Sequence, residues 1–167
     1  MNIAHLLLGS AREFRDLPAL ARGTAPYLGY RDLWRKVSVM STHLAGRFGL
    51  ARGDRVAFAM TNCVESIEVM YAIWHAGLCA VPMNAKLHPK ELAFILENSG
   101  AKLCFVTSDL AGDIAEAAKE APALKEIVDV TTRSYGFMAV GDPSPIADAE
   151  PTDPAWLFYT SGTTGRP

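Results

Sequence analysis

A stretch of glycine and hydroxyl residues near the end of the chain has the composition of an anion-binding loop. Glycine has no Cβ, so backbone N–H groups in such a loop can surround a ligand, and Ser and Thr hydroxyls add further donors. Phosphate oxygens are well suited to these donors. The stretch therefore predicts a phosphate-binding loop, although its residue types alone also fit a glycine-rich surface turn. The candidate phosphate contacts are Thr160, Ser161, Gly162, Thr163, Thr164 and Gly165.

Other phosphate-binding and catalytic motifs fit this loop less well. The Walker A motif needs Gly-x-x-x-x-Gly-Lys-Ser/Thr, and the spacing here is different. A nucleophile elbow would require glycine at the position of Tyr159, so Ser161 is not expected to act as a nucleophile. Residues 162–165 match the Gly-x-x-Gly clamp of KH-type RNA-binding domains. The net charge of -2 nevertheless argues against a nucleic-acid partner.

The overall composition predicts a globular protein. The 167 residues suffice for a real core, and 50% hydrophobic with 20% charged residues is too apolar for disorder. Cys63, Cys79 and Cys104 stand far apart among apolar residues, so they are expected to be buried thiols in a reducing compartment. We expect no metal site and no transmembrane segment, because metal-ligand spacing and an apolar run of about 20 residues are both missing from the sequence. A cytoplasmic location is the resulting expectation.

The elements that would position the loop alternate between strands and helices. Strands are expected at about residues 55–60, 78–82, 102–106, 126–130 and 155–160. Helices are expected at about 62–76, 89–100 and 108–121, with a short one near 134–140. This alternation predicts an α/β fold with a parallel βαβ-wound sheet that is covered on both faces. The last strand would return to the sheet and lead into the loop.

The first 50 residues do not show this alternation of strands and helices. They predict a helix over 3–16, a small hairpin around Gly23, and a long helix from Tyr30 to Phe48 that ends at Gly49. We therefore divide the chain into residues 1–50, with the helix, hairpin and long helix, and residues 51–167, an α/β subdomain that ends in the phosphate-binding loop. Together they form one incomplete domain.

Several residues carry local expectations. Thr61 or Asn62 is expected to cap the following helix, whose buried face would be Val64, Ile67, Tyr71 and Trp74. Asp54 and Arg55 are expected to form a surface pair. Asn84 is expected to fix a turn through its side chain, and His88 to be a capping or surface residue before Pro89. Trp34, Trp74 and Trp156 are expected to serve in packing.

Residues 159–167 closely resemble the phosphate-loop signature of the adenylate-forming, AMP-binding enzymes. This family includes acyl-CoA synthetases, beetle luciferases and the adenylation domains of nonribosomal peptide synthetases. Residues 29–33, 53–57, 81–84 and 97–102 follow the family's landmarks in order and spacing, although Gly29 replaces the usual Thr. Nearly the whole chain is covered, and it looks most like the bacterial acyl-CoA synthetases.

The resemblance implies part of the large N-terminal domain of a two-step ligase. Such an enzyme uses ATP, with Mg²⁺, to convert a carboxylate to an acyl-adenylate, and a thiol such as coenzyme A then accepts the acyl group. The loop would hold the β- and γ-phosphates: its four hydroxyl residues would donate hydrogen bonds, while Gly162 and Gly165 would permit close approach. These donors would stabilise charge on the pyrophosphate leaving group.

The resemblance also limits what this chain is expected to do. The family's adenine-binding motifs, acidic magnesium ligand and catalytic lysine follow the matched region, so no catalytic residue is expected among these 167 residues. The chain would then be an N-terminal portion that is inactive alone, with apolar surface in residues 1–50 left free for self-association. The alternative is a non-catalytic α/β module that binds a nucleotide or a partner.

Overall fold

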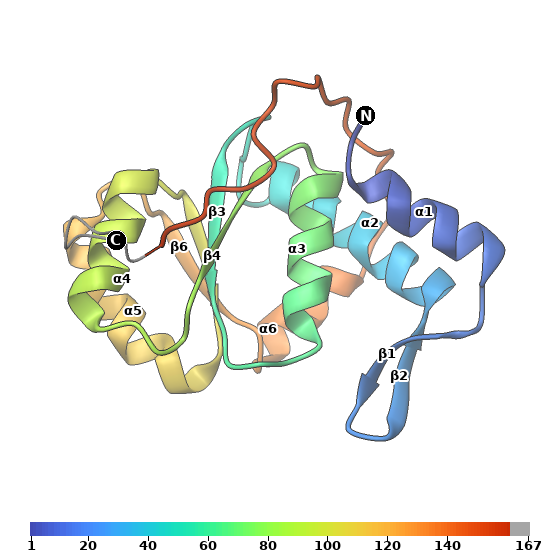
Figure 1. Ribbon diagram of the computed structural model, residues 1–167, viewed down its shortest axis with the longest axis horizontal. Helices are drawn as coiled ribbons and strands as arrows, with labels where there is room; N and C mark the ends of the chain where they lie inside the picture. The colour runs from blue at the N-terminus through green and yellow to red at the C-terminus, as the bar shows by residue number, and fades with distance from the viewer. Residues whose placement is uncertain (161–167) are drawn as a thin grey trace.

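A four-stranded parallel sheet with the order β4-β3-β5-β6 forms the centre of the molecule (Figure 1). The structure is a computed structural model that describes residues 1–160. The strands are β3 (Arg55–Ala59), β4 (Cys79–Met83), β5 (Leu103–Val106) and β6 (Glu126–Asp129). The central strand β3 aligns Val56 with Ala80 on one side and with Leu103 on the other. The prediction of an α/β fold with a parallel sheet is confirmed.

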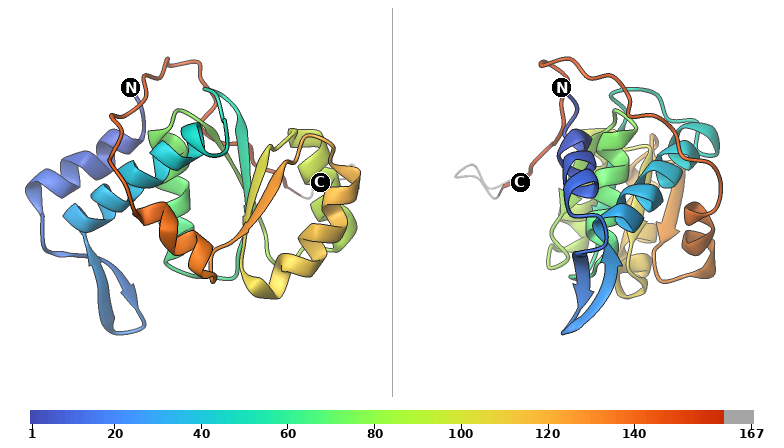
Figure 2. Two further views of the ribbon diagram at one scale, coloured as in Figure 1. Left: turned by 180° about the vertical axis from the view of Figure 1, so that it is seen from behind. Right: turned by 90° about the vertical axis from the view of Figure 1, so that its right-hand side faces the viewer.

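Helices cover both faces of the sheet, as Figure 2 shows from behind. Helices α2 (Tyr30–Gly46) and α3 (Glu65–His75) pack on one face, where Val56 and Phe58 point. Helices α4 (Pro89–Ser99) and α5 (Ala111–Ala117) pack on the other, against Ala57 and Ala59. Successive strand residues thus enter opposite cores, which explains why the strands are almost continuously apolar.

The remaining elements are found close to where the sequence predicts them. Helix α1 (Ala4–Glu13) is followed by the hairpin of β1 (Pro18–Arg22) and β2 (Ala25–Gly29), which projects from the body of the molecule (Figure 1). Short 3₁₀ turns η1 (Ser108–Leu110) and η2 (Ala118–Glu120) flank α5. The expected short helix near 134–140 is α6 (Arg133–Gly136) followed by η3 (Phe137–Ala139). These predictions are confirmed.

The predicted start of α3 is wrong. The helix begins at Glu65, with Val64 at the N-cap, and not after Thr61 or Asn62. The hydroxyl of Thr61 donates to Asp109 Oδ2 at 2.6 Å, and its backbone N–H donates to Thr107 Oγ1 at 3.1 Å. Thr61 therefore joins the ends of β3 and β5 and is not available as a helix cap.

The predicted buried face of α3 is also displaced. Val64, Ile67 and Tyr71 are only half-buried, while Trp74 is buried as expected. The fully enclosed face is formed by Glu68, Val69, Ala72, Ile73 and His75. The polar residues Glu68 and His75 interrupt the apolar periodicity of this face. A prediction from hydrophobic residues alone therefore picks the residues at the edge of the buried face and misses its centre.

Asp54 and Arg55 do not form a surface pair with each other, contrary to the prediction. Asp54 is buried and lies 2.7 Å from Lys102 Nζ. Although burial opposes the shift, hydrogen bonds from Lys102 and from the Ala51 backbone lower the pKa of Asp54. The Arg55 guanidinium instead donates from Nε to the carbonyl of Ser99 at 2.6 Å. The side chains separate because successive residues of an extended chain point in opposite directions.

The start of α4 has the predicted cap. The His88 side chain accepts a hydrogen bond from Lys90 N at 3.2 Å, and Glu91 Oε2 accepts one from His88 N at 2.8 Å. Pro89 at the first helical position already has a suitable φ angle. Just before this helix, Asn84 Oδ1 accepts from Lys86 N at 2.9 Å, which confirms the expected side-chain turn.

The cysteines on the strands are buried, as the sequence predicts. Burial raises the pKa of both thiols, that of Cys104 to about 12. Cys79 and Cys104 are completely enclosed, whereas Cys63 is half-buried. A protonated, enclosed thiol is a poor nucleophile, so both strand cysteines act as small core residues.

His75 gives the fold a specific acid sensitivity. Its ring is completely buried beside Trp34, and Nδ1 lies 3.0 Å from Ser41 Oγ. Burial lowers the pKa of His75 to about 4, so the folded protein holds the neutral ring. The unfolded chain has a pKa near 6.5 for histidine and binds the proton first.

We expect the free energy of unfolding to fall as the pH drops from about 6.5 to about 4, by about 3 kcal/mol from His75 alone. Above that window the contribution is fully present. Urea unfolding at a series of pH values measures it. The variant His75→Gln keeps a polar group near Ser41 but does not titrate, so its stability should depend less steeply on pH. Identical pH dependence in the two proteins would exclude this role.

Candidate functional site

Residues 155–160 run along the outer edge of β4 and lead toward the predicted loop. The Ala80 N–H donates to Ala155 O at 3.0 Å, and the Leu157 N–H donates to Ala80 O at 2.9 Å. These bonds form a single parallel bridge between Ala80 and Trp156. The predicted strand over 155–160 is therefore wrong in its extent. A continued ladder would need an N–H from Pro82, the next residue of β4 whose backbone faces this segment, and proline has none.

Aromatic contacts hold the first half of this segment. The Trp74 indole N–H donates to Ala155 O at 3.0 Å, and the rings of Trp74 and Trp156 meet edge to face with centroids 4.5 Å apart. Phe158 stacks on Trp156 at 5.0 Å and is 67% exposed. The packing roles expected for Trp74 and Trp156 are confirmed, and Trp34 packs against His75.

The second half of the segment is held by α4. Leu157 and Tyr159 pack on the core beneath α4, on the opposite side from Trp156. The Tyr159 ring meets Phe94 edge to face at 6.3 Å, and its hydroxyl donates to Asn98 Oδ1 at 2.8 Å. This alternation of sides is that of an extended chain.

The structure places one of the six predicted phosphate contacts. Thr160 directly follows Tyr159 and is exposed. Ser161, Gly162, Thr163, Thr164 and Gly165 lie outside the described residues. Because the bridge to β4 is parallel, the chain reaches Thr160 while running toward the carboxyl end of that strand. Ligands of open parallel sheets bind at this end.

A cleft of about 830 Å³ lies at the carboxyl ends of β3 and β5, and sequence reasoning did not find it. Chain order places β4 on one side of β3 and β5 on the other, so the winding of the sheet reverses between β3 and β5. Open α/β sheets form ligand crevices at such a reversal. The lining residues are Leu20, Ala21, Arg22, Gly23, Asn62, Cys63, Val64, Glu65, Ile67, Thr107, Val130 and Thr131.

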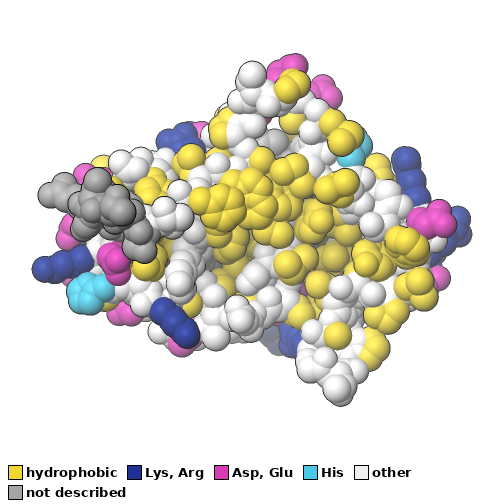
Figure 3. Space-filling view, viewed as in Figure 1, with side chains coloured by type: hydrophobic (Ala, Val, Ile, Leu, Met, Phe, Trp, Pro, Cys, Tyr) yellow, Lys and Arg dark blue, Asp and Glu magenta, His cyan; other side chains and the backbone are white. Residues whose placement is uncertain are grey.

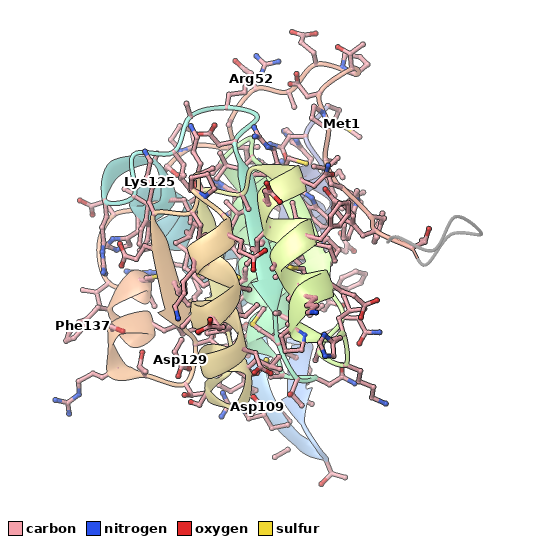
Figure 4. The ribbon with its side chains drawn as sticks, turned by 90° about the vertical axis from the view of Figure 1, so that its left-hand side faces the viewer. Met1, Arg52, Asp109, Lys125, Asp129 and Phe137 are labelled. Carbon is pink, nitrogen blue, oxygen red and sulfur yellow. The ribbon has the colours of Figure 1, made fainter. Side chains whose placement is uncertain are left out.

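The carboxyl end of the sheet is acidic. Figure 4 shows Asp109 and Asp129 at this end, with Arg52 and Lys125 at the other. Hydrogen bonds from Thr107 and Thr61 lower the pKa of Asp109. Burial opposes the same shift at Asp129, but hydrogen bonds from its neighbours Thr131 and Ser108 lower its pKa as well. Two ionised carboxylates at this end of the sheet disfavour a bare phosphate nearby.

Two classes of site receive no support from the described residues. Within residues 1–160, no group of three or more His, Cys, Asp or Glu side chains is arranged to hold a metal ion. Over the same range, no helix combines the length and apolar character that crossing a bilayer requires.

A parallel sheet with helices on both faces, and a glycine- and hydroxyl-rich sequence beyond its edge, places this chain in the α/β class. Residues 8–167 match the family of AMP-binding enzymes, and the chain belongs to that family. The resemblance seen in the sequence is thereby confirmed.

Individual relatives include CoA ligases. The chain is 31% identical to 3-hydroxybenzoate–CoA ligase of Aromatoleum sp., over 100% of this chain and 33% of the ligase. It is 28% identical to long-chain-fatty-acid–CoA ligase FadD13 of Mycobacterium tuberculosis, over 90% of this chain and 31% of the ligase. Naringenin synthase of Pestalotiopsis fici is 33% identical, over 99% of this chain and 7% of the synthase. The chain thus spans a third or less of these relatives.

Solved structures show the same architecture. The inhibitor-bound N-terminal domain of FACL13 from Mycobacterium tuberculosis superposes with a TM-score of 0.86 at 26% identity, over 98% of this chain and 42% of that one. The anthranilate CoA ligase AuaEII, in complex with anthranoyl-AMP, gives a TM-score of 0.89 at 23% identity, over 99% of this chain and 32% of that one. The second likeness supports the fold alone. The prediction that the chain forms part of the large N-terminal domain of an adenylate-forming enzyme is confirmed.

Proposed function

We propose that this chain supplies the phosphate-binding part of an ATP-dependent acid–thiol ligase. In the first step a carboxylate oxygen attacks the α-phosphorus of ATP, which forms an acyl-adenylate and releases pyrophosphate. In the second step the sulfur of coenzyme A attacks the acyl carbon and releases AMP. The observation that carries the proposal is the signature at residues 159–167 in a chain of the AMP-binding family.

The predicted loop has a defined role in the first step. Thr160, Ser161, Thr163 and Thr164 would donate hydrogen bonds to the β- and γ-phosphates, and the two loop glycines would let the backbone approach them. Because negative charge grows on the pyrophosphate as its bond to the α-phosphorus breaks, these donors would stabilise the transition state. Mg²⁺ would enter with ATP and neutralise phosphate charge. We assign no catalytic residue within residues 1–167.

For the acid substrate we propose only its chemical class, a carboxylate. Hydroxybenzoate and long-chain fatty acid are the acids named for two of the relatives, and these differ greatly in shape. Fatty acid activation is one form of the same chemistry. We place the reaction in the cytoplasm, where ATP and coenzyme A are both present and where free thiols such as Cys63, Cys79 and Cys104 stay reduced.

Product analysis tests this function. The complete gene product that contains these residues is incubated with ATP, Mg²⁺, coenzyme A and a panel of carboxylates, and mass spectrometry follows AMP and acyl-CoA. We expect both products in equal amounts with at least one acid. The 167 residues tested alone should form neither, since they span about a third of the related ligases. Binding of ATP without either product in the complete protein would favour the non-catalytic module instead.

Self-association is a further expectation from the exposed apolar surface. Figure 3 shows apolar side chains gathered in a broad band across one face, from the terminal segment over α3 toward α1. Phe158 is 67% exposed and Leu6 60% exposed. A groove of about 400 Å³ on this surface is lined by Leu6, Leu7, Ser10, Ala19, Leu20, Tyr30, Leu33, Ile67, Met70 and Tyr71.

We expect the 167-residue chain to form dimers or larger species at high concentration, because water drives such apolar surface together. Sedimentation velocity measures the distribution of species. Replacing Phe158 and Leu6 together by Ser should shift it toward monomer, whereas Lys119→Ser, on the remote and charged α5–η2 surface, should leave it unchanged. A single monomeric species at all concentrations would contradict the expectation.

A further inference from the structure

We propose that Asn98 is a positioning residue for the phosphate loop and acts through Tyr159. The inference rests on the proposed function and adds to it a residue 62 positions before Thr160 in the sequence. Asn98 lies in the last turn of α4 and belongs to none of the loop positions. Its role follows from how the chain is held immediately before the loop.

In the segment 155–160, backbone hydrogen bonds to the sheet are made only at its beginning. Leu157 makes the last backbone hydrogen bond between this segment and β4 in the described part of the chain. Pro82 cannot donate the next one. Phe158 is mostly exposed, and its one aromatic contact among residues 1–160 is with Trp156. The last described side chain that ties the segment to the body of the molecule is therefore Tyr159, one residue before Thr160.

Helix α4 offers Tyr159 two contacts on one face. Phe94 and Asn98 are four residues apart, so they lie one above the other on the helix surface. Phe94 meets the ring of Tyr159 edge to face at 6.3 Å, and Asn98 Oδ1 accepts from its hydroxyl at 2.8 Å. Fixing the ring and the hydroxyl together sets both the position and the rotation of this side chain.

The helix itself is firmly placed. A capping box at His88 and Glu91 fixes its start, and Gly100 ends it in the left-handed conformation with φ 60°. The Arg55 guanidinium donates to the carbonyls of Ser99 and Gly100, which lie directly after Asn98. Because α4 is held at both ends, its backbone gives Asn98 a fixed base next to Tyr159, the residue before the loop.

Fixing the residue before a phosphate-binding loop should improve the affinity of the loop for phosphates. A loop whose first residue is free must lose more conformational freedom when ATP binds. Removing the Tyr159–Asn98 hydrogen bond should therefore raise the KM for ATP by about 3- to 10-fold, as expected for one hydrogen bond. The KM for the carboxylate should stay unchanged, because Tyr159 directly precedes the candidate phosphate contacts, which begin at Thr160.

Steady-state kinetics of the complete gene product test the proposal with Asn98→Ala, Tyr159→Phe and the double variant. Each single variant should raise the KM for ATP, and the double variant should raise it no further, because one bond is lost in all three. Glu97→Ala, an exposed neighbour on the same helix, is the matched control and should leave the KM unchanged. Alanine favours helix more than asparagine does, so Asn98→Ala should not lower the melting temperature.

Different results would contradict the positioning role of Asn98 and the proposed function. A purely structural role would lower the active fraction, and so kcat, without changing the KM for ATP, which would overturn the proposal. Additive effects of the two single variants would also overturn it, because they would show that Tyr159 and Asn98 act independently. Absence of any carboxylate-dependent ATP turnover in the unaltered protein would instead overturn the proposed function, and the positioning role with it.

Discussion

Replacing Thr163 by valine is expected to lower kcat/KM for ATP about 10- to 100-fold, because a hydrogen bond to a charged group contributes about 1.5–3 kcal/mol. Valine has nearly the shape of threonine but lacks the hydroxyl, so the substitution removes a donor with little change of volume. The affected ligand would be the phosphate chain of ATP, and the loss should grow as charge develops on pyrophosphate. Initial rates of AMP formation at varied ATP measure the effect.

Thr163→Ser is the matched control for this prediction. Serine keeps the hydroxyl and loses only a methyl group, so kcat/KM for ATP should stay within about threefold of the unaltered value. Equal losses in the two variants would mean that the methyl group or the local backbone matters and not the hydroxyl. A loss below about twofold in Thr163→Val would show that this side chain does not bind the phosphates.

The second large effect is expected in the core, at Glu68. Its carboxylate is completely buried between α2 and α3, and Oε2 lies 2.7 Å from Lys36 Nζ and 2.6 Å from the Tyr135 hydroxyl that donates to it. Glu68→Leu would leave the largely buried Lys36 ammonium without its counter-charge. We expect a loss of about 3–5 kcal/mol in the free energy of unfolding, measured by urea denaturation.

A triple variant distinguishes a lost ion pair from lost packing. Lys36→Met, Glu68→Leu and Tyr135→Phe together remove all three polar groups while keeping most of their volume. Replacing a buried ionic group by apolar residues is often neutral, so the triple variant should recover most of the stability lost in Glu68→Leu. A triple variant as unstable as the single one would show that the leucine does not fit its site and that charge is not the cause.

The sequence was most informative where a local signal decides the structure. Gly49, Gly77 and Gly100 all have positive φ angles near 60–71° at or just beyond the helix ends where the sequence predicts them. Glycine adopts this conformation at little cost, so its position predicts a helix end with no knowledge of the rest of the fold. The resulting order of strands and helices was enough to predict the parallel sheet.

Features that depend on distant residues could not be predicted in this way. The cleft brings the hairpin around Gly23 together with Thr107 and Thr131, and only the folded sheet brings these three segments together. The one available signal was that hydroxyl residues follow β5 and β6, at the end where parallel sheets bind ligands. Glu68 was missed because a buried acid interrupts an apolar pattern, and its partners Lys36 and Tyr135 lie on other elements.

Residues 155–160 include features of both kinds, those set by local sequence and those set by distant residues. The aromatic and apolar run at 155–160 correctly indicated an extended segment beside the sheet, and the signature that follows it identified the family. Its pairing was overestimated because Pro82, on the neighbouring strand, prevents a longer ladder. The contact between Tyr159 and Asn98 replaces that pairing, and no pattern within either segment points to it.

Exchange of labelled pyrophosphate into ATP tests the central claim most directly, because it reports the adenylation step without the thiol. The complete gene product is mixed with ATP, Mg²⁺, labelled pyrophosphate and a panel of carboxylates, in the absence of coenzyme A. We expect label in ATP only when a suitable carboxylate is present, and a strongly reduced rate in Thr163→Val. Failure to exchange with any carboxylate, in a folded protein that binds ATP, would contradict the assignment of this chain to an adenylate-forming ligase reaction.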